Sequence, residues 1–193
     1  MAGIIDFDTS HYWGSSGGVF RAITSSIIEL LPNTDSAIRV RGFLNDAIDS
    51  NLMYVNFADD FDPGMKADFA EALWRHCNDP KTLDPSLFAE PEFHPGYLAR
   101  LFQLLCMVEG DLEIASAVTA MKLMDLPALE NVANRGMAAK LADDLQWIEA
   151  KRLRDGLTES EEIHANVIRR NWAWAMTIEN HATALLMRWK IGI

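Results

Sequence analysis

The sequence has few cysteines, no long hydrophobic run and no basic segment at its start. Its two cysteines, Cys77 and Cys106, lie in apolar helical patterns, so we expect reduced packing residues rather than a disulfide framework. The longest uncharged apolar run, Leu101 to Val108, is far shorter than the roughly 20 residues that span a bilayer. Asp6 and Asp8 occupy the place where a secretory signal would be basic. We therefore expect a cytoplasmic protein that does not insert into a membrane.

Positive charge is scarce in one part of the chain. Residues 1–134 contain 20 Asp and Glu against 8 Lys and Arg, a net charge of −12. Residues 135–193 contain 8 against 9, a net charge of +1. A concentrated negative surface attracts basic partners and repels nucleic acid and anionic membranes. The sequence therefore predicts a basic protein partner and argues against binding to nucleic acid or a membrane.

The length and the composition predict a single domain. A chain of 193 residues can bury a core without a disulfide or a metal. Within this domain, residues 1–193, we distinguish an acidic part, 1–134, from a charge-balanced helical part, 135–193. Hydrophobic periodicity and capping signals predict a mainly α bundle of about seven helices.

Two helix starts and two short strands can be placed from local signals. Asp62 followed by proline marks one helix start, and Thr158-x-x-Glu161 is a capping box for a last helix that reaches about residue 190. Residues 4–7 have the pattern of a strand. Residues 52–57 alternate like a strand but could also continue the preceding helix. An α+β fold with two short N-terminal strands is therefore the alternative.

The glycine-rich run 14–18 lies before a predicted helix that begins near residue 19. Backbone N–H groups at a helix start attract anions, but this run lacks the lysine of a phosphate-binding loop. We therefore interpret it as a flexible turn that ends in a glycine or serine cap.

The run IIDFDTS, residues 4–10, resembles the first motif of haloacid-dehalogenase-type phosphatases. In that family an apolar strand presents an aspartate nucleophile, and a second aspartate two residues later acts as acid and base. The resemblance would give these roles to Asp6 and Asp8. The family has Thr or Val in place of Ser10 and needs a parallel sheet, which a helix-rich chain does not supply. We therefore interpret the run as an edge strand.

The densest acidic segment lies around the predicted helix start at Asp62. Part of this charge serves helix capping, and a solvated acidic surface is the simplest interpretation. The functional interpretation is a docking surface for a basic partner, in which carboxylates raise the association rate and aromatic side chains supply affinity. The candidate residues come from this segment and from the proline-rich loop 79–95: Asp59, Asp60, Phe61, Asp62, Phe88, Glu90, Glu92 and Phe93.

A metal site in the last helix is a weaker candidate. Glu161-x-x-His164 has the spacing of di-iron carboxylate bundles, but no second copy of the motif exists in the sequence. Glu161 also has a sufficient role in the capping box. Glu179 and His181 lie two residues apart and therefore on different faces of the helix. We therefore predict no metal and no other cofactor.

The segment RRNWAW, residues 169–174, combines cations with aromatic rings that could stack on nucleic-acid bases. The net charge of −11 opposes that use at long range. We instead expect Trp172 and Trp174 to anchor the last helix in the core, with the two arginines paired to acids of residues 1–134.

These observations favour a non-catalytic acidic protein that covers a basic surface of another protein. The concrete form is an immunity-type or other inhibitor that neutralises a toxin or nuclease, and the chain is similar in character to bacterial immunity proteins. One alternative is a helical-bundle enzyme or metal-binding protein with a site around Glu161, His164, Glu179 and His181. The other is a regulatory subunit that binds through an apolar helix face.

Overall fold

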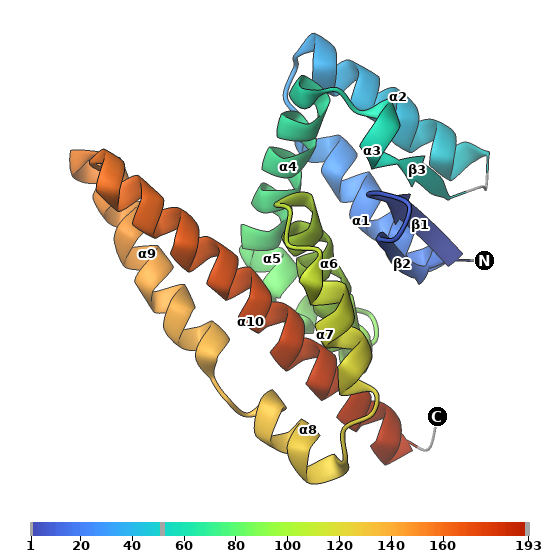
Figure 1. The fold of residues 1–193 in the computed structure, drawn as a ribbon, viewed down its shortest axis with the longest axis vertical. Coiled ribbons are helices and arrows are strands. Elements are labelled where there is room, and N and C mark those ends of the chain that lie inside the picture. The colour runs from blue at the N-terminus through green and yellow to red at the C-terminus, as the bar shows by residue number, and fades with distance from the viewer. Residues whose placement is uncertain (1, 51–52, 192–193) are drawn as a thin grey trace.

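The computed structural model describes residues 2–50 and 53–191, and it confirms the mainly α class with short N-terminal strands (Figure 1). The elements in chain order are β1 (Ala2–Asp6), β2 (Tyr12–Ser16), α1 (Gly17–Leu30), α2 (Asp35–Asp49), β3 (Tyr54–Asn56), α3 (Phe57–Asp60), α4 (Pro63–Asn78), α5 (Pro80–Leu83), the 3-10 turns η1 (Pro85–Leu87) and η2 (Pro91–Phe93), α6 (His94–Val108), α7 (Glu113–Met121), α8 (Leu126–Ala133), α9 (Met137–Asp155) and α10 (Glu159–Ile191).

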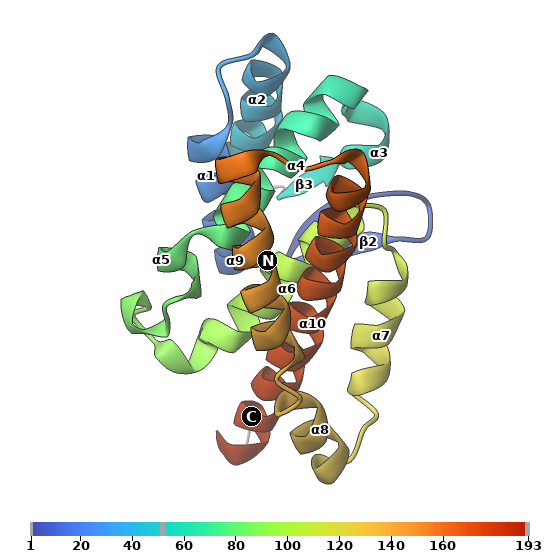
Figure 2. The same ribbon diagram turned by 90° about the vertical axis from the view of Figure 1, so that its left-hand side faces the viewer.

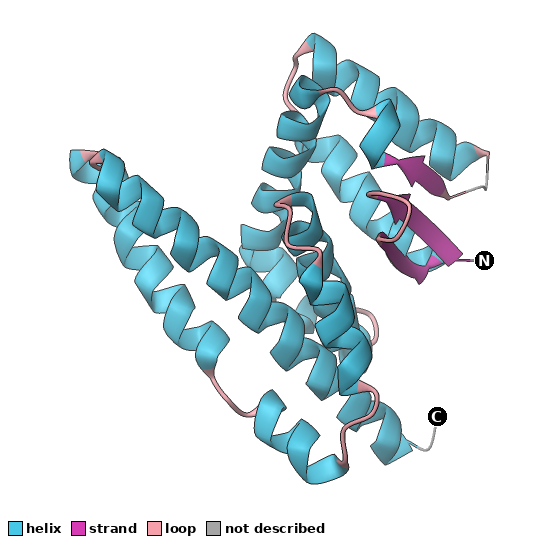
Figure 3. Cartoon of the chain, viewed as in Figure 1, coloured by secondary structure: helices cyan, strands magenta, loops and turns pink. Residues whose placement is uncertain are grey.

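The small sheet has the strand order β2-β1-β3 (Figure 3). β1 pairs antiparallel with β2 and parallel with β3, so that Ile5 lies between Trp13 and Val55. All three side chains are buried. The sheet approaches α1 so closely that a Cβ atom at Gly3 would overlap the Phe20 ring. This contact fixes the sheet against the first helix.

Two predictions about strands need correction or completion. Residues 14–16 are not a flexible turn but the end of β2, because Gly14 and Ser15 pair with β1. The expected cap is present: the Ser16 hydroxyl accepts a hydrogen bond from the N–H of Val19, and α1 begins at residue 17. In the ambiguous segment 52–57, residue 52 lies outside the described residues, and a strand followed by the one-turn α3 occupies the rest.

The predicted helix starts are confirmed. Asp62 accepts a hydrogen bond from the N–H of Met65 at 2.9 Å, and proline follows it as the first helical residue of α4. The N–H of Thr158 donates to Glu161 at 2.9 Å, and the N–H of Glu161 donates back to the Thr158 hydroxyl at 3.3 Å. This is the reciprocal geometry of a capping box.

The core is arranged around α6 and α10. Buried side chains lie on nearly all sides of α6, as expected for the apolar run from Leu101 to Val108. α6 contacts α10, α4 and β2, and α10 continues past it to contact α8 and α9 (Figure 1). One connected cluster of buried side chains extends from Ile5 to Ala173. The helices thereby share packing with the N-terminal sheet.

The aromatic segment of α10 contributes to this core. Trp172 is buried, with its ring 4.9 Å from that of Phe102 and 5.8 Å from that of Trp74. The prediction for the arginines is confirmed only in part. Arg169 pairs at 2.5 Å with Glu149 of α9, which lies outside residues 1–134, because α9 and α10 form an antiparallel pair. Burial raises the pKa of Glu109, and the charges of Arg170 and Arg169 oppose that rise, so both arginines also act on an acid of residues 1–134.

Both cysteines are free and buried, as predicted. Burial raises the pKa of the Cys106 thiol to about 12, so the thiol stays protonated and packs as an apolar group. Across the described parts of the chain, no helix combines the length and the apolar character needed to cross a bilayer.

Candidate functional site

The parallel pairing of β1 with β3 brings acidic residues from distant parts of the sequence to one exposed tyrosine. The Tyr54 hydroxyl donates a hydrogen bond to Asp6 Oδ2 at 3.1 Å. α3 begins directly after β3 and carries Asp59 and Asp60, which are both exposed. Tyr54 itself is 47% exposed. We name these four residues, Asp6, Tyr54, Asp59 and Asp60, the Tyr54 cluster.

The Tyr54 cluster is strongly negative. Its carboxylates raise the pKa of the Tyr54 hydroxyl, first through the hydrogen bond to Asp6 and also through the charges of Asp60 and Asp59. Among the described residues, none of these three aspartates forms an ion pair with Lys or Arg. The nearby Lys66 instead donates to the carbonyl oxygen of Ala58 at 3.0 Å. Asp59 and Asp60 are therefore exposed without a basic partner in the described chain, although Asp59 accepts a hydrogen bond from Asn56 Nδ2 at 3.0 Å, and Asp6 is half-buried.

The C-terminal end of α2 adds further negative charge beside the cluster. Asp46 and Asp49 are exposed in the last turn of α2, which contains no basic residue. The N–H of Met53 donates to the carbonyl oxygen of Ala47 at 3.0 Å and holds this helix end next to β3. A helix C-terminus favours cations, and acids there cost about 0.3–1 kcal/mol each. Asp46 and Asp49 thus lower the stability of the helix end at which they lie.

Phe61 is buried and does not form the predicted anchor. It is 3% exposed, and its ring packs against those of Phe57, Phe69 and Phe43 at 5.2–5.8 Å. Phe43 of α2 is the exposed member of this group, at 40%. The aromatic surface next to the acids is therefore made by Tyr54 and Phe43, because Phe61 is needed inside the core.

Asp62 also differs from its predicted role in docking. Its carboxylate caps α4 and forms an ion pair with Arg39 at 2.7 Å. The hydrogen bond from the N–H of Met65, and next the bond from Arg39, lower the pKa of this carboxyl group. Asp62 is thus partly neutralised, in contrast to Asp59 and Asp60.

The remaining predicted residues lie on another side of the molecule. Figure 2 shows α3 and the connection from α5 to α6 on opposite sides of the view. Phe88 packs down, with its ring 4.4 Å from that of His94 and 5.2 Å from that of Tyr97. Phe93 is 53% exposed, and Glu90 and Glu92 are exposed beside it. The expectation of a single docking surface is therefore wrong, because the fold separates the two acidic segments.

The four residues of the alternative metal or catalytic site do not come together. All four lie on α10, where the 18 residues from Glu161 to Glu179 correspond to about 27 Å. Glu161 is held by the capping box and by Lys151, which together lower its pKa to about 2. His164 is exposed, and Glu179 accepts hydrogen bonds from the first N–H groups of α9. Within residues 2–50 and 53–191, no group of three or more His, Cys, Asp or Glu is placed to hold a metal ion.

The phosphatase-like motif is also explained by local structure. Asp8 accepts hydrogen bonds from the N–H of Ser10 at 2.7 Å and from His11, and so closes the turn between β1 and β2. The bond from Ser10, followed by that from His11, lowers the pKa of Asp8. Asp6 faces Tyr54 instead. Asp8 therefore stabilises a turn, and Asp6 belongs to the Tyr54 cluster.

Sequence reasoning found Asp59 and Asp60 but missed Asp6 and Tyr54 as members of the cluster. The sequence pattern predicted an edge strand for Asp6, which is wrong because β1 is the central strand of the sheet, and it left the segment of Tyr54 ambiguous. The signal that links them is the parallel pairing of residues 4–6 with residues 54–56. This parallel pairing can be predicted from the sequence only when both strands have been recognised.

Comparisons with models of protein families, with curated proteins and with solved structures find no match to this chain.

Proposed function

We propose that this protein is a non-catalytic binding protein that covers a basic surface of a partner protein with the Tyr54 cluster. The observation that carries the proposal is the placement of three carboxylates without Lys or Arg partners, within the described residues, around a half-exposed tyrosine. Charged groups at an interface chiefly raise the association rate and select partners, whereas buried aromatic residues supply affinity. The cluster supplies both kinds of group.

The surroundings of the cluster support this proposal. Asp46 and Asp49 extend the negative charge at a helix end where it lowers stability. Phe43 offers a second exposed ring, held in place from behind by buried Phe61. Tyrosine and phenylalanine within an acidic border match the usual composition of an interface centre and its rim.

The concrete form of the proposal is an immunity-type inhibitor of a toxin or nuclease. A nuclease binds phosphates with Lys and Arg, so its working surface is basic. An acidic surface of this kind can cover that site and exclude the nucleic acid. The net charge of −11 acts in the same direction at long range.

The proposal is tested by affinity capture from a lysate of the source cells with three baits. The first is the natural chain, and the second carries Asp6→Asn, Asp59→Asn and Asp60→Asn. The control bait carries Glu90→Gln, Glu92→Gln and Glu130→Gln, which removes the same charge from exposed positions elsewhere.

The proposal predicts that the natural chain and the control capture the same basic protein, which moderate salt releases, and that the cluster variant fails to capture it. Equal capture by all three baits would contradict the role of the Tyr54 cluster.

A second candidate function is a regulatory subunit that binds through apolar helix faces. The pair α9–α10 exposes Trp147 at 67%, Ile163 at 61% and Val167 at 48%, and the last two lie one turn apart on α10. Association through these side chains would change little between low and moderate salt, whereas association through the Tyr54 cluster would weaken steeply.

A further inference from the structure

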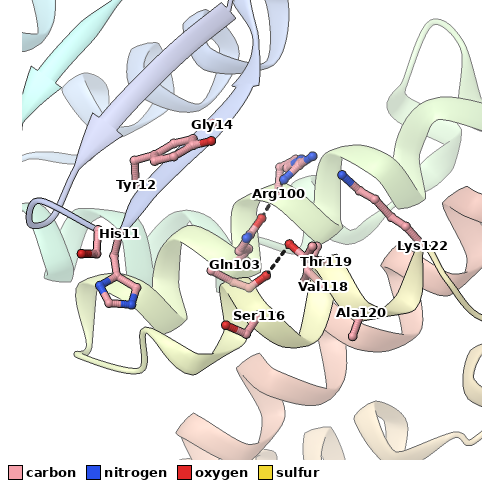
Figure 4. A pocket seen from close by; sticks show the side chains of 12 residues that line it. His11, Tyr12, Gly14, Arg100, Gln103, Ser116, Val118, Thr119, Ala120 and Lys122 are labelled. Atoms are coloured by element: carbon pink, nitrogen blue, oxygen red, sulfur yellow. Dashed lines mark hydrogen bonds between the residues drawn. The ribbon is translucent and has the colours of Figure 1, made fainter.

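A cavity of about 660 Å³ lies between β2, α6 and α7 (Figure 4). Its volume falls in the range of small-molecule sites, about 300–1,000 Å³. Gly14 contributes from β2, and the small apolar side chains of Ala115 and Val118 form part of the lining from α7. The polar residues that line it include His11, Arg100, Gln103, Ser116, Thr119 and Lys122.

The cavity carries positive charge in an acidic protein. Figure 4 shows the Arg100 and Lys122 side chains reaching the same end of the cavity. The only hydrogen bond of the Arg100 guanidinium group within the described residues goes to Gln103 Oε1, at 2.9 Å. The ammonium group of Lys122 has no hydrogen bond or ion pair with the described residues, and only the backbone N–H of Lys122 is bonded, to the carbonyl oxygen of Thr119. Neither cation therefore has a carboxylate partner in the described parts of the chain.

Several basic residues elsewhere are paired with carboxylates, whereas Arg100 and Lys122 are not, among the described residues. Ion pairs hold Arg39, Arg75, Lys151, Arg152, Arg154 and Arg169. Burial lowers the pKa of Arg100, and Arg188 of α10 lowers it further. A partly buried cation beside other cations, with only a neutral amide as partner, is unfavourable unless an anion completes the site.

His181 shows independently that these cations converge. This histidine is 8% exposed, and its Nε2 atom has no hydrogen-bond partner. After burial, the groups that most depress its pKa are Arg100, Lys122 and Arg188. Helix α10, which carries His181 and Arg188, packs against both α6 and α7. The charges of Arg100, Lys122 and Arg188 thus act together on one buried imidazole.

We propose that this cavity binds a small phosphate monoester, with its phosphate group between Arg100 and Lys122. The planar guanidinium group of Arg100 matches the geometry of phosphate oxygens, and Lys122 adds a mobile point charge. A phosphate monoester carries a charge of about −1.5 to −2 at neutral pH and therefore neutralises several cations better than a single carboxylate does. The Thr119 hydroxyl donates to the carbonyl oxygen of Ala115 at 2.9 Å and can accept a hydrogen bond from the polar remainder of the ligand, which the Ser116 hydroxyl can also meet.

The acidic character of the chain does not prevent this binding. Charges separated by more than about 8 Å are largely screened at physiological ionic strength. The ligand therefore senses chiefly the cations that line the cavity. The carboxylate of Asp8, the acid bonded to His11 of the lining, is already occupied by that histidine and by the turn.

The test is isothermal titration of the full chain with ribose 5-phosphate, inorganic phosphate, ribose and citrate. The natural chain should bind both phosphate compounds, should not bind ribose, and should bind citrate more weakly. The Lys122 side chain is exposed and has no hydrogen-bond partner among the described residues, so Lys122→Gln leaves the fold intact and should weaken ribose 5-phosphate binding about tenfold or more. Lys122→Arg should restore most of the affinity, and Arg100→Gln should abolish it.

Lys140→Gln is the matched control, because it removes an exposed cation of α9 outside the cavity lining. It should change the affinity less than twofold. Absence of phosphate binding at millimolar concentration, or equal weakening by Lys122→Gln and Lys140→Gln, would overturn the proposal. Tighter binding of citrate than of ribose 5-phosphate would overturn the assignment of the ligand as a phosphate monoester.

Discussion

At the residue scale, His181 links burial to a measurable dependence of stability on pH. Burial, followed by the charges of Arg100, Lys122 and Arg188, lowers its pKa to about 4 in the folded chain. The unfolded chain has a histidine pKa near 6.5. As the pH falls, the unfolded state therefore takes up the proton first. The contribution of neutral His181 to stability is complete above about pH 6.5 and is lost as the pH falls toward about 4.

The variant His181→Gln isolates this effect, because other titrating groups cancel in the comparison. Between pH 7 and pH 4.5 the natural chain should lose up to about 3 kcal/mol more of its unfolding free energy than the variant loses. Urea unfolding at several pH values measures both slopes. Parallel pH profiles for the two chains would contradict the assignment of His181 as a buried neutral group.

Trp172 gives a second prediction at this scale. Its ring is buried between Phe102 and Trp74, so Trp172→Ala should lower the unfolding free energy by about 3–5 kcal/mol. The matched control is Trp147→Ala, because Trp147 is 67% exposed and its loss should cost less than about 0.5 kcal/mol. Urea unfolding of both variants tests the difference, and similar losses would contradict the core position of Trp172.

At the element scale, Glu179 acts as a cap from another helix. Gly136 precedes α9 with a φ of 66° and offers no capping side chain. Glu179 Oε1 of α10 instead accepts hydrogen bonds from the N–H groups of Met137, at 2.7 Å, and Ala138, at 3.3 Å. A carboxylate at a helix N-terminus also interacts favourably with the positive end of the helix dipole. This long-range cap explains an acid that the sequence had offered as a site residue.

Removal of this cap should loosen the start of α9. Glu179→Ala should lower the unfolding free energy by about 0.5–2 kcal/mol. Hydrogen exchange of the Met137 and Ala138 amides should become faster, while that of amides in α4 should stay unchanged. Glu130→Ala, an exposed change on α8, is the control. Unchanged exchange at both amides would show that the carboxylate does not cap the helix.

Helices with local signals and the strand at residues 4–7 were predictable from the sequence, whereas β2 was not. Asp62 with its following proline, and Thr158 with Glu161, act over a few residues and were confirmed. β2 was missed because Gly14 and Ser15 have little intrinsic preference for strands. They are extended because they pair with β1, and such tertiary context is absent from the local pattern.

At the scale of the whole molecule, α10 completes the core. It packs along α6, where Trp172 meets Phe102 and Thr177 lies against Cys106. A chain that ends at Gly156 would leave these apolar surfaces of α6 open to solvent. We expect this fragment to aggregate, which size-exclusion chromatography with light scattering would detect. A folded, monomeric fragment would contradict the central place of α10.

The candidate site could be predicted only in part, because charge along the sequence does not fix charge in space. The excess of acid in residues 1–134 correctly pointed to Asp59 and Asp60 as exposed groups. The same count could not show that Glu90 and Glu92 lie on another side, or that Asp6 joins Tyr54 through a parallel strand pair. It also hid the cationic cavity, because Arg100 and Lys122 come together only when α6 and α7 are folded against β2.

The proposed role of the Tyr54 cluster is tested most directly by the association rate between this protein and the captured partner, measured by stopped flow at several ionic strengths. The three chains of the capture experiment are compared. For the natural chain and the Glu90, Glu92 and Glu130 control, the rate should fall steeply with added salt. The Asp6→Asn, Asp59→Asn, Asp60→Asn variant should associate about tenfold or more slowly at low salt and show a shallower dependence. A cluster variant with the same rate and the same salt dependence as the natural chain would contradict the proposed role of the Tyr54 cluster.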